Sequence, residues 1–147
     1  MNLSDVDVTH AIQLSVAPVF LVTGVSGLLG VIASRLSRVI DRARVLEGGW
    51  NSLATAERAP VELELSTLRR RAHLASWAIN FAATSALLVC VLIATLFIDA
   101  MTGMNLRWLV AFQFILSMFC LIVAVICFLR EVYLATHALR IGPAVGS

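Results

Sequence analysis

Charged side chains are scarce in this sequence. Asp, Glu and Arg make up 14% of the 147 residues, and Lys is absent, so that all eleven basic residues are Arg. A soluble domain carries about 25% charged residues, and one of this length buries only about 70% of the surface of its unfolded chain. Because 60% of the residues are apolar, a soluble fold could not hide them. The composition argues against a soluble enzyme, a disordered chain and a nucleic-acid partner.

Residues that carry catalysis are equally scarce. The sequence has no glycine-rich phosphate loop, no nucleophile elbow and no pair of carboxylates within an apolar run. His10 is predicted to lie on one side of a membrane, and His73 and His137 lie on the other side on different helices. The three cysteines form no C-x-x-C pair, which favours packing over a disulfide framework. We expect no enzyme activity, no cofactor and no metal site.

Three long runs without Asp, Glu or Arg stand out instead. They contain 27, 27 and 22 residues and extend over Val8–Ser34, Ala72–Ile98 and Trp108–Leu129. Each exceeds the roughly 20 residues that a helix needs to cross the hydrocarbon core of a bilayer. The sequence predicts an all-α membrane protein, with residues 1–147 forming a single integral membrane domain whose spans lie at about 8–34, 72–98 and 107–129.

The arginines predict an orientation. Eight of the eleven lie between Arg35 and Arg71, whereas none precedes the first span and only Arg107 lies between the second and third spans. Basic residues accumulate on the cytoplasmic side of a membrane. The segment 35–71 and the carboxyl terminus are therefore predicted to be cytoplasmic, with the amino terminus outside.

The segment between the first two spans is predicted to be helical. Apolar residues recur at helical spacing as far as Gly48-Gly49, which favours a first helix that continues beyond the membrane. Pro60 suits the first turn of a returning helix. We therefore expect a cytoplasmic antiparallel helical hairpin over about 35–71, with a connector Gly48–Ala59 that carries Trp50. The third helix is expected to continue as a cytoplasmic helix over about 130–142.

Several stretches resemble a known bacterial family. They are Ala17-Pro18-Val19-Phe20-Leu21-Val22-Thr23-Gly24, the segment from Arg35 to Arg44, Arg69-Arg70-Arg71, and the segment from Ser85 to Cys90. Together they are similar to the family known as domain of unknown function number 2721, from about Ile12 to Leu129. The resemblance implies a small integral protein of the bacterial inner membrane. It implies no activity, substrate or catalytic residue.

One narrow face of the first helix is the main candidate site. At about 100° per residue, the residues that share this face are Gln13, Ala17, Phe20, Gly24, Val31, Arg35, Arg38 and Arg42. If several copies surround an axis with this face inward, they form a pore. Phe20 and Val31 would be apolar constrictions, and the arginines would surround the cytoplasmic mouth, where arginine rings favour anions. Alternatively, these arginines contact anionic lipid headgroups or pair with Glu62 and Glu64, and Arg69-Arg70-Arg71 anchors the chain to lipid.

A stripe of small residues lies beside that face and consists of Thr23, Gly27, Gly30 and Ser34. Small residues let helices approach closely in lipid. The stripe is predicted to pack either against the other two helices of the chain or against a neighbouring subunit. Farther along the chain, Asn80 and Thr84 share a face of the second span, and Gln113 and Ser117 share a face of the third. These polar pairs predict interhelical hydrogen bonds or a polar lining.

Two functions fit this pattern. The first is a cyclic homo-oligomer that forms an ion-conducting pore lined by the first helix. The second is a membrane-anchored scaffold or regulator that binds a cytoplasmic protein through the hairpin. A proton-coupled transporter is disfavoured, because the interiors of the spans contain no Asp, Glu or His.

Overall fold

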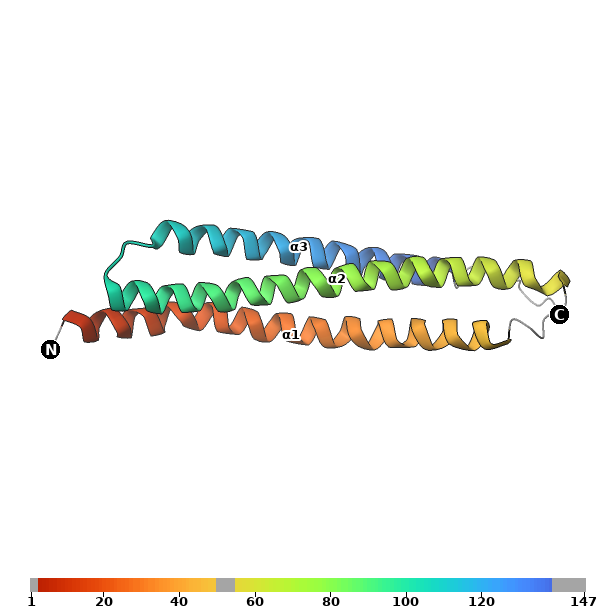
Figure 1. The fold of residues 1–147 in the computed structure, drawn as a ribbon, viewed down its shortest axis with the longest axis horizontal. Helices are drawn as coiled ribbons and strands as arrows, with labels where there is room; N and C mark the ends of the chain where they lie inside the picture. Colours follow the sequence, from red (N-terminus) through yellow and green to blue (C-terminus); the bar gives the residue numbers. More distant parts are fainter. Residues whose placement is uncertain (1–2, 50–54, 139–147) are drawn as a thin grey trace.

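Three long helices make up the protein in a computed structural model, which describes residues 3–49 and 55–138, without the side chains of residues 3–8, 55–57 and 137–138. They are α1 (Leu3–Gly49), α2 (Thr55–Thr102) and α3 (Arg107–Ala138) (Figure 1). Each helix is long and apolar enough to cross a membrane, and the described residues contain no strand. The predicted all-α fold with three long apolar helices is confirmed.

Helices α1 and α2 are much longer than a membrane span. Their 47 and 48 residues correspond to about 70 Å each at 1.5 Å per residue, more than twice the roughly 30 Å of hydrocarbon. The two helices lie side by side and run in opposite directions (Figure 1). Val25, Ile32 and Val39, spaced seven residues apart, are buried on one face of α1. This face packs against α2 along both the apolar run and the charged segment that follows it.

The second helix begins earlier than predicted. We expected α1 to end at Gly48-Gly49, which it does, and the returning helix to begin at Pro60, but α2 already begins at Thr55. Ala, Glu and Arg at positions 56–58 favour helix. Pro60 is the sixth residue of α2 and removes a single backbone hydrogen bond near the helix end. Trp50 lies outside the described residues, as does the part of the predicted helix 130–142 beyond Ala138.

A four-residue loop joins α2 to α3. Gly103 has a φ of 65° and its N–H donates to the carbonyl oxygen of Asp99 at 2.9 Å, which is a common glycine ending for a helix. The carboxylate Oδ1 of Asp99 accepts the N–H of Leu106 at 2.9 Å. The loop is therefore held by the end of α2 and positions the start of α3.

The three helices meet in the middle of the bundle and toward the end that carries Arg35 and Arg71. One buried cluster contains Val25, Ala82 and Ala124, which come from α1, α2 and α3 respectively. A second cluster contains Ile32 of α1 with Ala75 and Ala78 of α2, and Cys127 and Phe128 of α3 pack against it. Three of the alanines are fully buried, namely Ala78, Ala82 and Ala124. Small side chains on α2 and α3 thus let the helices approach closely.

The opposite end of the bundle is open. Figure 1 shows α3 starting on the far side of α2 from α1 and converging on the other helices along its length. An open cavity of about 1000 Å³ lies between the helices here. Apolar residues such as Leu14, Leu92 and Phe114 form its walls, and His10, Asp99 and Arg107 lie among the lining residues. We call this the loop end, because Gly103–Leu106 lies there, and the end with Arg35 and Arg71 the arginine end.

Candidate functional site

Glu131 is the buried acidic side chain in the described part of the bundle. It lies on α3, two residues after the apolar run ends, and the residue is only 1% exposed. A carboxylate that loses its water of hydration needs charged hydrogen-bond donors, because the unpaired ion would cost several kcal/mol. The partners of Glu131 therefore determine how the third helix is held.

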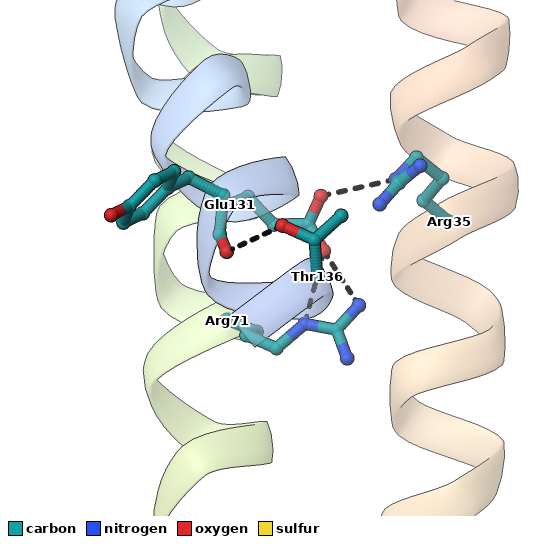
Figure 2. A network of polar contacts seen from close by, with 5 residues as sticks. Arg35, Arg71, Glu131 and Thr136 are labelled. Atoms are coloured by element: carbon teal, nitrogen blue, oxygen red, sulfur yellow. Dashed lines mark hydrogen bonds and ion pairs between the residues drawn. The ribbon is translucent and has the colours of Figure 1, made fainter. Parts of the chain in front are cut away.

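Both other helices supply an arginine to this carboxylate. Arg35 of α1 donates from Nε to Oε2 of Glu131 at 3.0 Å. Arg71 of α2 donates to Oε1 from Nε at 3.1 Å and from Nη2 at 2.8 Å. Figure 2 shows the two guanidinium groups reaching the carboxylate from opposite helices. Glu131 thus joins α1, α2 and α3 at one point, which we call the ion-pair cluster.

The cluster has one more positive than negative charge. The Arg71 side chain is 19% exposed and the Arg35 side chain 34% exposed, so Arg71 is the more enclosed of the two. The guanidinium carbon of Arg35 also lies 5.8 Å from the ring centre of Phe128, on the preceding turn of α3. This contact is within the range of a cation–π interaction. Arg35 is therefore held to α3 by two neighbouring residues.

Sequence reasoning missed Glu131, although a signal was present. Arg35 directly follows the first uncharged run, Arg71 directly precedes the second, and Glu131 follows the third with one residue between. Helices that cross the same bilayer bring such flanking residues to a similar depth. Glu131 is also the only acidic residue between Arg107 and the end of the sequence. A lone carboxylate at the level of two arginines indicates their partner.

The predicted pore face of α1 is divided in the structure. Gln13, Phe20, Gly24 and Val31 are exposed, on the side of α1 that α2 does not cover. Arg35 turns to Glu131, and Arg42 pairs instead with Glu64 on α2, from Nε to Oε1 at 2.9 Å. Arg38 is exposed and makes no ion pair with any residue that the structure describes.

The Arg42–Glu64 pair is one of the contacts that the sequence suggested. The hydrogen bond and the charge of Glu64 raise the pKa of Arg42 above its ordinary value. Because that ordinary value already lies far above neutrality, Arg42 stays charged at every physiological pH. The pair lies on the part of α1 and α2 beyond the uncharged runs, residues 35–49 and 55–71, which we call the α1–α2 arm. It is exposed there, and exposed ion pairs contribute little to stability.

Helix geometry explains why Arg35 leaves the exposed face. A residue repeated every seven positions shifts by about 20° around a straight helix. The buried face of α1 follows Val25, Ile32 and Val39 and therefore turns gradually toward the predicted pore face. By the level of Arg35, the long guanidinium side chain reaches the other helices. Sequence reasoning applied one fixed face to the whole helix and did not include this shift.

The comparisons agree with the resemblance seen in the sequence. A family model described as a protein of unknown function (DUF2721) matches residues 15–141. The chain belongs to the DUF2721 family. No curated protein and no solved structure matches it. The matched region of this DUF2721 protein includes Arg35, Arg71 and Glu131, so the whole ion-pair cluster lies within the part that defines the family.

The small-residue stripe of the DUF2721 protein faces away from its own bundle. Thr23, Gly27, Gly30 and Ser34 are all exposed. A Cβ atom placed on Gly24, Gly27 or Gly30 would have no heavy atom within 4 Å, apart from those of its immediate helical surroundings. Contacts within one chain therefore do not occupy these glycines. The alternative that the stripe packs against a neighbouring subunit stays a prediction.

A buried pair of serines joins α2 to α3 near the middle of the bundle. The hydroxyl of Ser85 donates to the carbonyl oxygen of Ser117 at 2.9 Å. In return, the hydroxyl of Ser117 donates to the carbonyl oxygen of Ser85 at 3.2 Å. Both residues are fully buried. Ser117 was among the polar residues expected to bond between helices, whereas its partner was not. Thr84 bonds to the carbonyl oxygen of Asn80 in its own helix.

Metal-ligating side chains are not clustered in the part of the chain that the structure describes. There, no group of three or more His, Cys, Asp or Glu side chains lies close enough to hold a metal ion. The side-chain oxygen of Gln113, one turn before Ser117 on α3, is buried and has no hydrogen-bond partner among the described residues. The arrangement can hold helices together and present an uncovered face of α1.

Proposed function

We propose that this DUF2721 protein forms a cyclic homo-oligomer in the bacterial inner membrane, and that the ring encloses an ion-conducting pore lined by α1. The exposed glycines of α1 are the observation that carries the proposal. Within the chain, α1 is covered on the side of α2, while Gly24, Gly27 and Gly30 meet open space. In lipid, such surfaces allow two helices to pack closely.

The apolar side chains on the same side of α1 support a gated pathway. Phe20 is 73% exposed and Val31 is 53% exposed in the single chain. In a ring they would form two apolar constrictions, which control ion flow by excluding water. The arginine content of the mouth differs from that expected from sequence, because Arg35 and Arg42 are in ion pairs. Of the three arginines predicted at the mouth, Arg38 is then the one without an ion pair among the described residues.

The proposed orientation follows the arginine distribution. The arginine end faces the cytoplasm and the loop end faces outward, because basic residues accumulate on the cytoplasmic side of a membrane. The ion-pair cluster then lies at the cytoplasmic boundary of the membrane. There it fixes α1 to α2 and α3, so that the exposed face of α1 keeps one direction in every subunit.

Assembly is tested by adding bulk to the exposed face. Gly27→Leu places a side chain where the single chain has open space, so each subunit folds normally. We expect the ring to dissociate, measured as the subunit number by native mass spectrometry. Ala94→Leu is the matched control, since Ala94 is also exposed but lies on α2. A ring that survives Gly27→Leu, or dissociates equally in both variants, contradicts assembly through α1.

Conduction is tested in planar bilayers with the purified protein. Phe20→Ala removes the larger apolar constriction, so we expect a higher single-channel conductance. Phe119→Ala on α3, where Phe119 is 61% exposed, removes the same side chain elsewhere and should leave the conductance unchanged. Bilayers that stay silent at all voltages, or currents that are insensitive to Phe20, would rule out a pore lined by α1.

A scaffold is the second candidate, and two exposed apolar residues favour it. Val45 and Leu63 are 68% and 72% exposed on the α1–α2 arm, beyond the uncharged runs. A bound protein would bury this apolar surface and gain the corresponding hydrophobic free energy. This function predicts that Leu63→Gln abolishes binding of a co-purifying partner. The pore predicts instead that Leu63→Gln leaves the currents intact.

A further inference from the structure

A basic pocket lies between α2 and α3 at the arginine end. Its volume is about 490 Å³, and its lining residues are Arg69, Arg70, His73, Leu74, Arg130 and Leu134. The pocket adjoins the ion-pair cluster in sequence on both helices. Arg71 and Glu131 point into the bundle, whereas the residues directly before them, Arg70 and Arg130, are exposed and line the pocket.

The pocket has an excess of positive charge. Three guanidinium groups contribute to its lining, and the lining contains no acidic residue. Arg69 has one acidic neighbour outside it, since Nη2 lies 3.8 Å from Oε1 of Glu47, with both side chains mostly exposed. Among the described residues, Arg70 and Arg130 make no ion pair. Bringing like charges together is unfavourable unless an anion lies between them.

His73 adds an oriented hydrogen-bond donor. Its Nε2 accepts the indole N–H of Trp77 at 2.9 Å. A neutral imidazole whose Nε2 accepts a hydrogen bond carries its proton on Nδ1, which leaves Nδ1–H to donate. Trp77 in turn stacks on Phe81, with the ring centres 5.7 Å apart. The Trp77 indole therefore contacts His73, which lines the pocket.

We propose that this pocket binds a phosphate group, with Arg70 and Arg130 as the principal ligands, Arg69 in support and His73 donating from Nδ1. Guanidinium groups recognise phosphate oxygens by paired hydrogen bonds. The pocket lies where the uncharged runs of α2 and α3 end, between Arg71 and Ala72 and between Leu129 and Arg130. This is the level of lipid headgroups, and Leu74 and Leu134 offer apolar contact beside the charges. The site is independent of the pore.

Fluorescence of Trp77 provides a direct assay on the full chain. Trp50→Phe and Trp108→Phe leave Trp77 as the single tryptophan. This protein, in neutral detergent, is titrated with short-chain phosphatidylglycerol, with short-chain phosphatidylcholine, and with inorganic phosphate. We expect a saturable change in emission with phosphatidylglycerol, at concentrations at which phosphatidylcholine has no effect. Saturation by inorganic phosphate at equal concentration supports the phosphate site and assigns it to a soluble ligand instead of lipid.

Matched variants separate the pocket from general charge effects. Arg130→Gln is expected to weaken phosphatidylglycerol binding about fivefold, and Arg70→Gln with Arg130→Gln about 25-fold. Arg107→Gln removes the same charge from the other end of α3 and should leave binding unchanged. Helical circular dichroism of each variant verifies folding, because these exposed side chains support no buried contact. Absence of saturation with every probe, or equal weakening in Arg107→Gln and Arg130→Gln, overturns the proposal.

Discussion

The two ends of the bundle hold their helices in different ways. At the arginine end, α1, α2 and α3 converge on the carboxylate of Glu131. At the loop end, α1 and α3 diverge around a cavity of about 1000 Å³, and Asp99 organises the loop that joins α2 to α3. Buried charged contacts therefore join all three helices at one end, while apolar surface stays uncovered by the chain at the other.

The side chains at each end explain the difference. Fully buried alanines lie at the contact surfaces of α2 and α3 in the convergent part, namely Ala78, Ala82 and Ala124. At the loop end, bulkier residues such as Leu92 and Phe114 line the cavity. Lipid tails are as apolar as these side chains, so no water-driven force presses the helices together there. Close packing in the membrane therefore requires small residues or hydrogen bonds.

The strongest test removes the charge at the convergent end. Glu131→Gln leaves Arg35 and Arg71 without a counter-charge in a partly buried position. We expect a loss of about 3 kcal/mol in the free energy of unfolding, measured by SDS titration in mixed micelles. Glu64→Gln, on the exposed pair with Arg42, should have little effect. If both variants lose the same free energy of unfolding, the buried ion-pair cluster holds the helices no more strongly than the exposed Arg42–Glu64 pair.

A matched pair of substitutions on α3 probes packing at both ends. Ala124 is fully buried among the three helices, so Ala124→Leu should overpack the core and cost about 2 kcal/mol. Ala111 is exposed and lines the cavity at the loop end. Ala111→Leu should therefore change the free energy of unfolding by less than about 0.5 kcal/mol. If thermal unfolding shows similar losses of stability for Ala124→Leu and Ala111→Leu, the loop end is packed as tightly as the core around Ala124.

The smallest expected effect concerns the serine pair between these regions. Ser85→Ala removes the interhelical hydrogen bonds to Ser117, which should cost about 0.6 kcal/mol, the average for such bonds in membrane helices. Thr84→Ala is the control, since Thr84 bonds within its own helix. The measurement is again SDS titration. If Ser85→Ala lost more free energy of unfolding than Glu131→Gln, the helices would be held mainly by the serine pair in the middle of the bundle and not by the ion-pair cluster.

The sequence was sufficient to predict three long apolar helices. Uncharged runs of more than 20 residues have few alternatives in a chain with so little charge. Helical spacing after Arg35 also predicted that α1 continues to Gly49, which the structure describes as helix. The start of α2 was placed too late, because Pro60 was given more weight than the helix-forming residues 56–58 before it.

The candidate site was harder to predict. Periodicity placed Arg35 and Arg42 on one face and allowed Glu64 as a partner, which Arg42 takes. It did not identify Glu131 as the partner of Arg35, since a long guanidinium side chain reaches across neighbouring helices. The pairing of Arg35 with Glu131 joins residues 96 positions apart, and it depends on how α3 packs against α1. The basic pocket likewise requires α2 and α3 to be placed together. Local sequence carries the residues of such sites but not their neighbours.

The ion-pair cluster can form only after the last of its three residues, Glu131, has been synthesised. Arg35 and Arg71 precede Glu131 by 96 and 60 residues. At a translation rate of about 5–20 residues per second, Glu131 follows Arg71 by roughly 3–12 s. During that interval α1 and α2 exist with two guanidinium groups that await one carboxylate. Arrival of the last helix neutralises one of them and locks the other two helices in register. A chain that ends before Glu131 lacks this closing step, and its Arg35 and Arg71 have no shared carboxylate to bind.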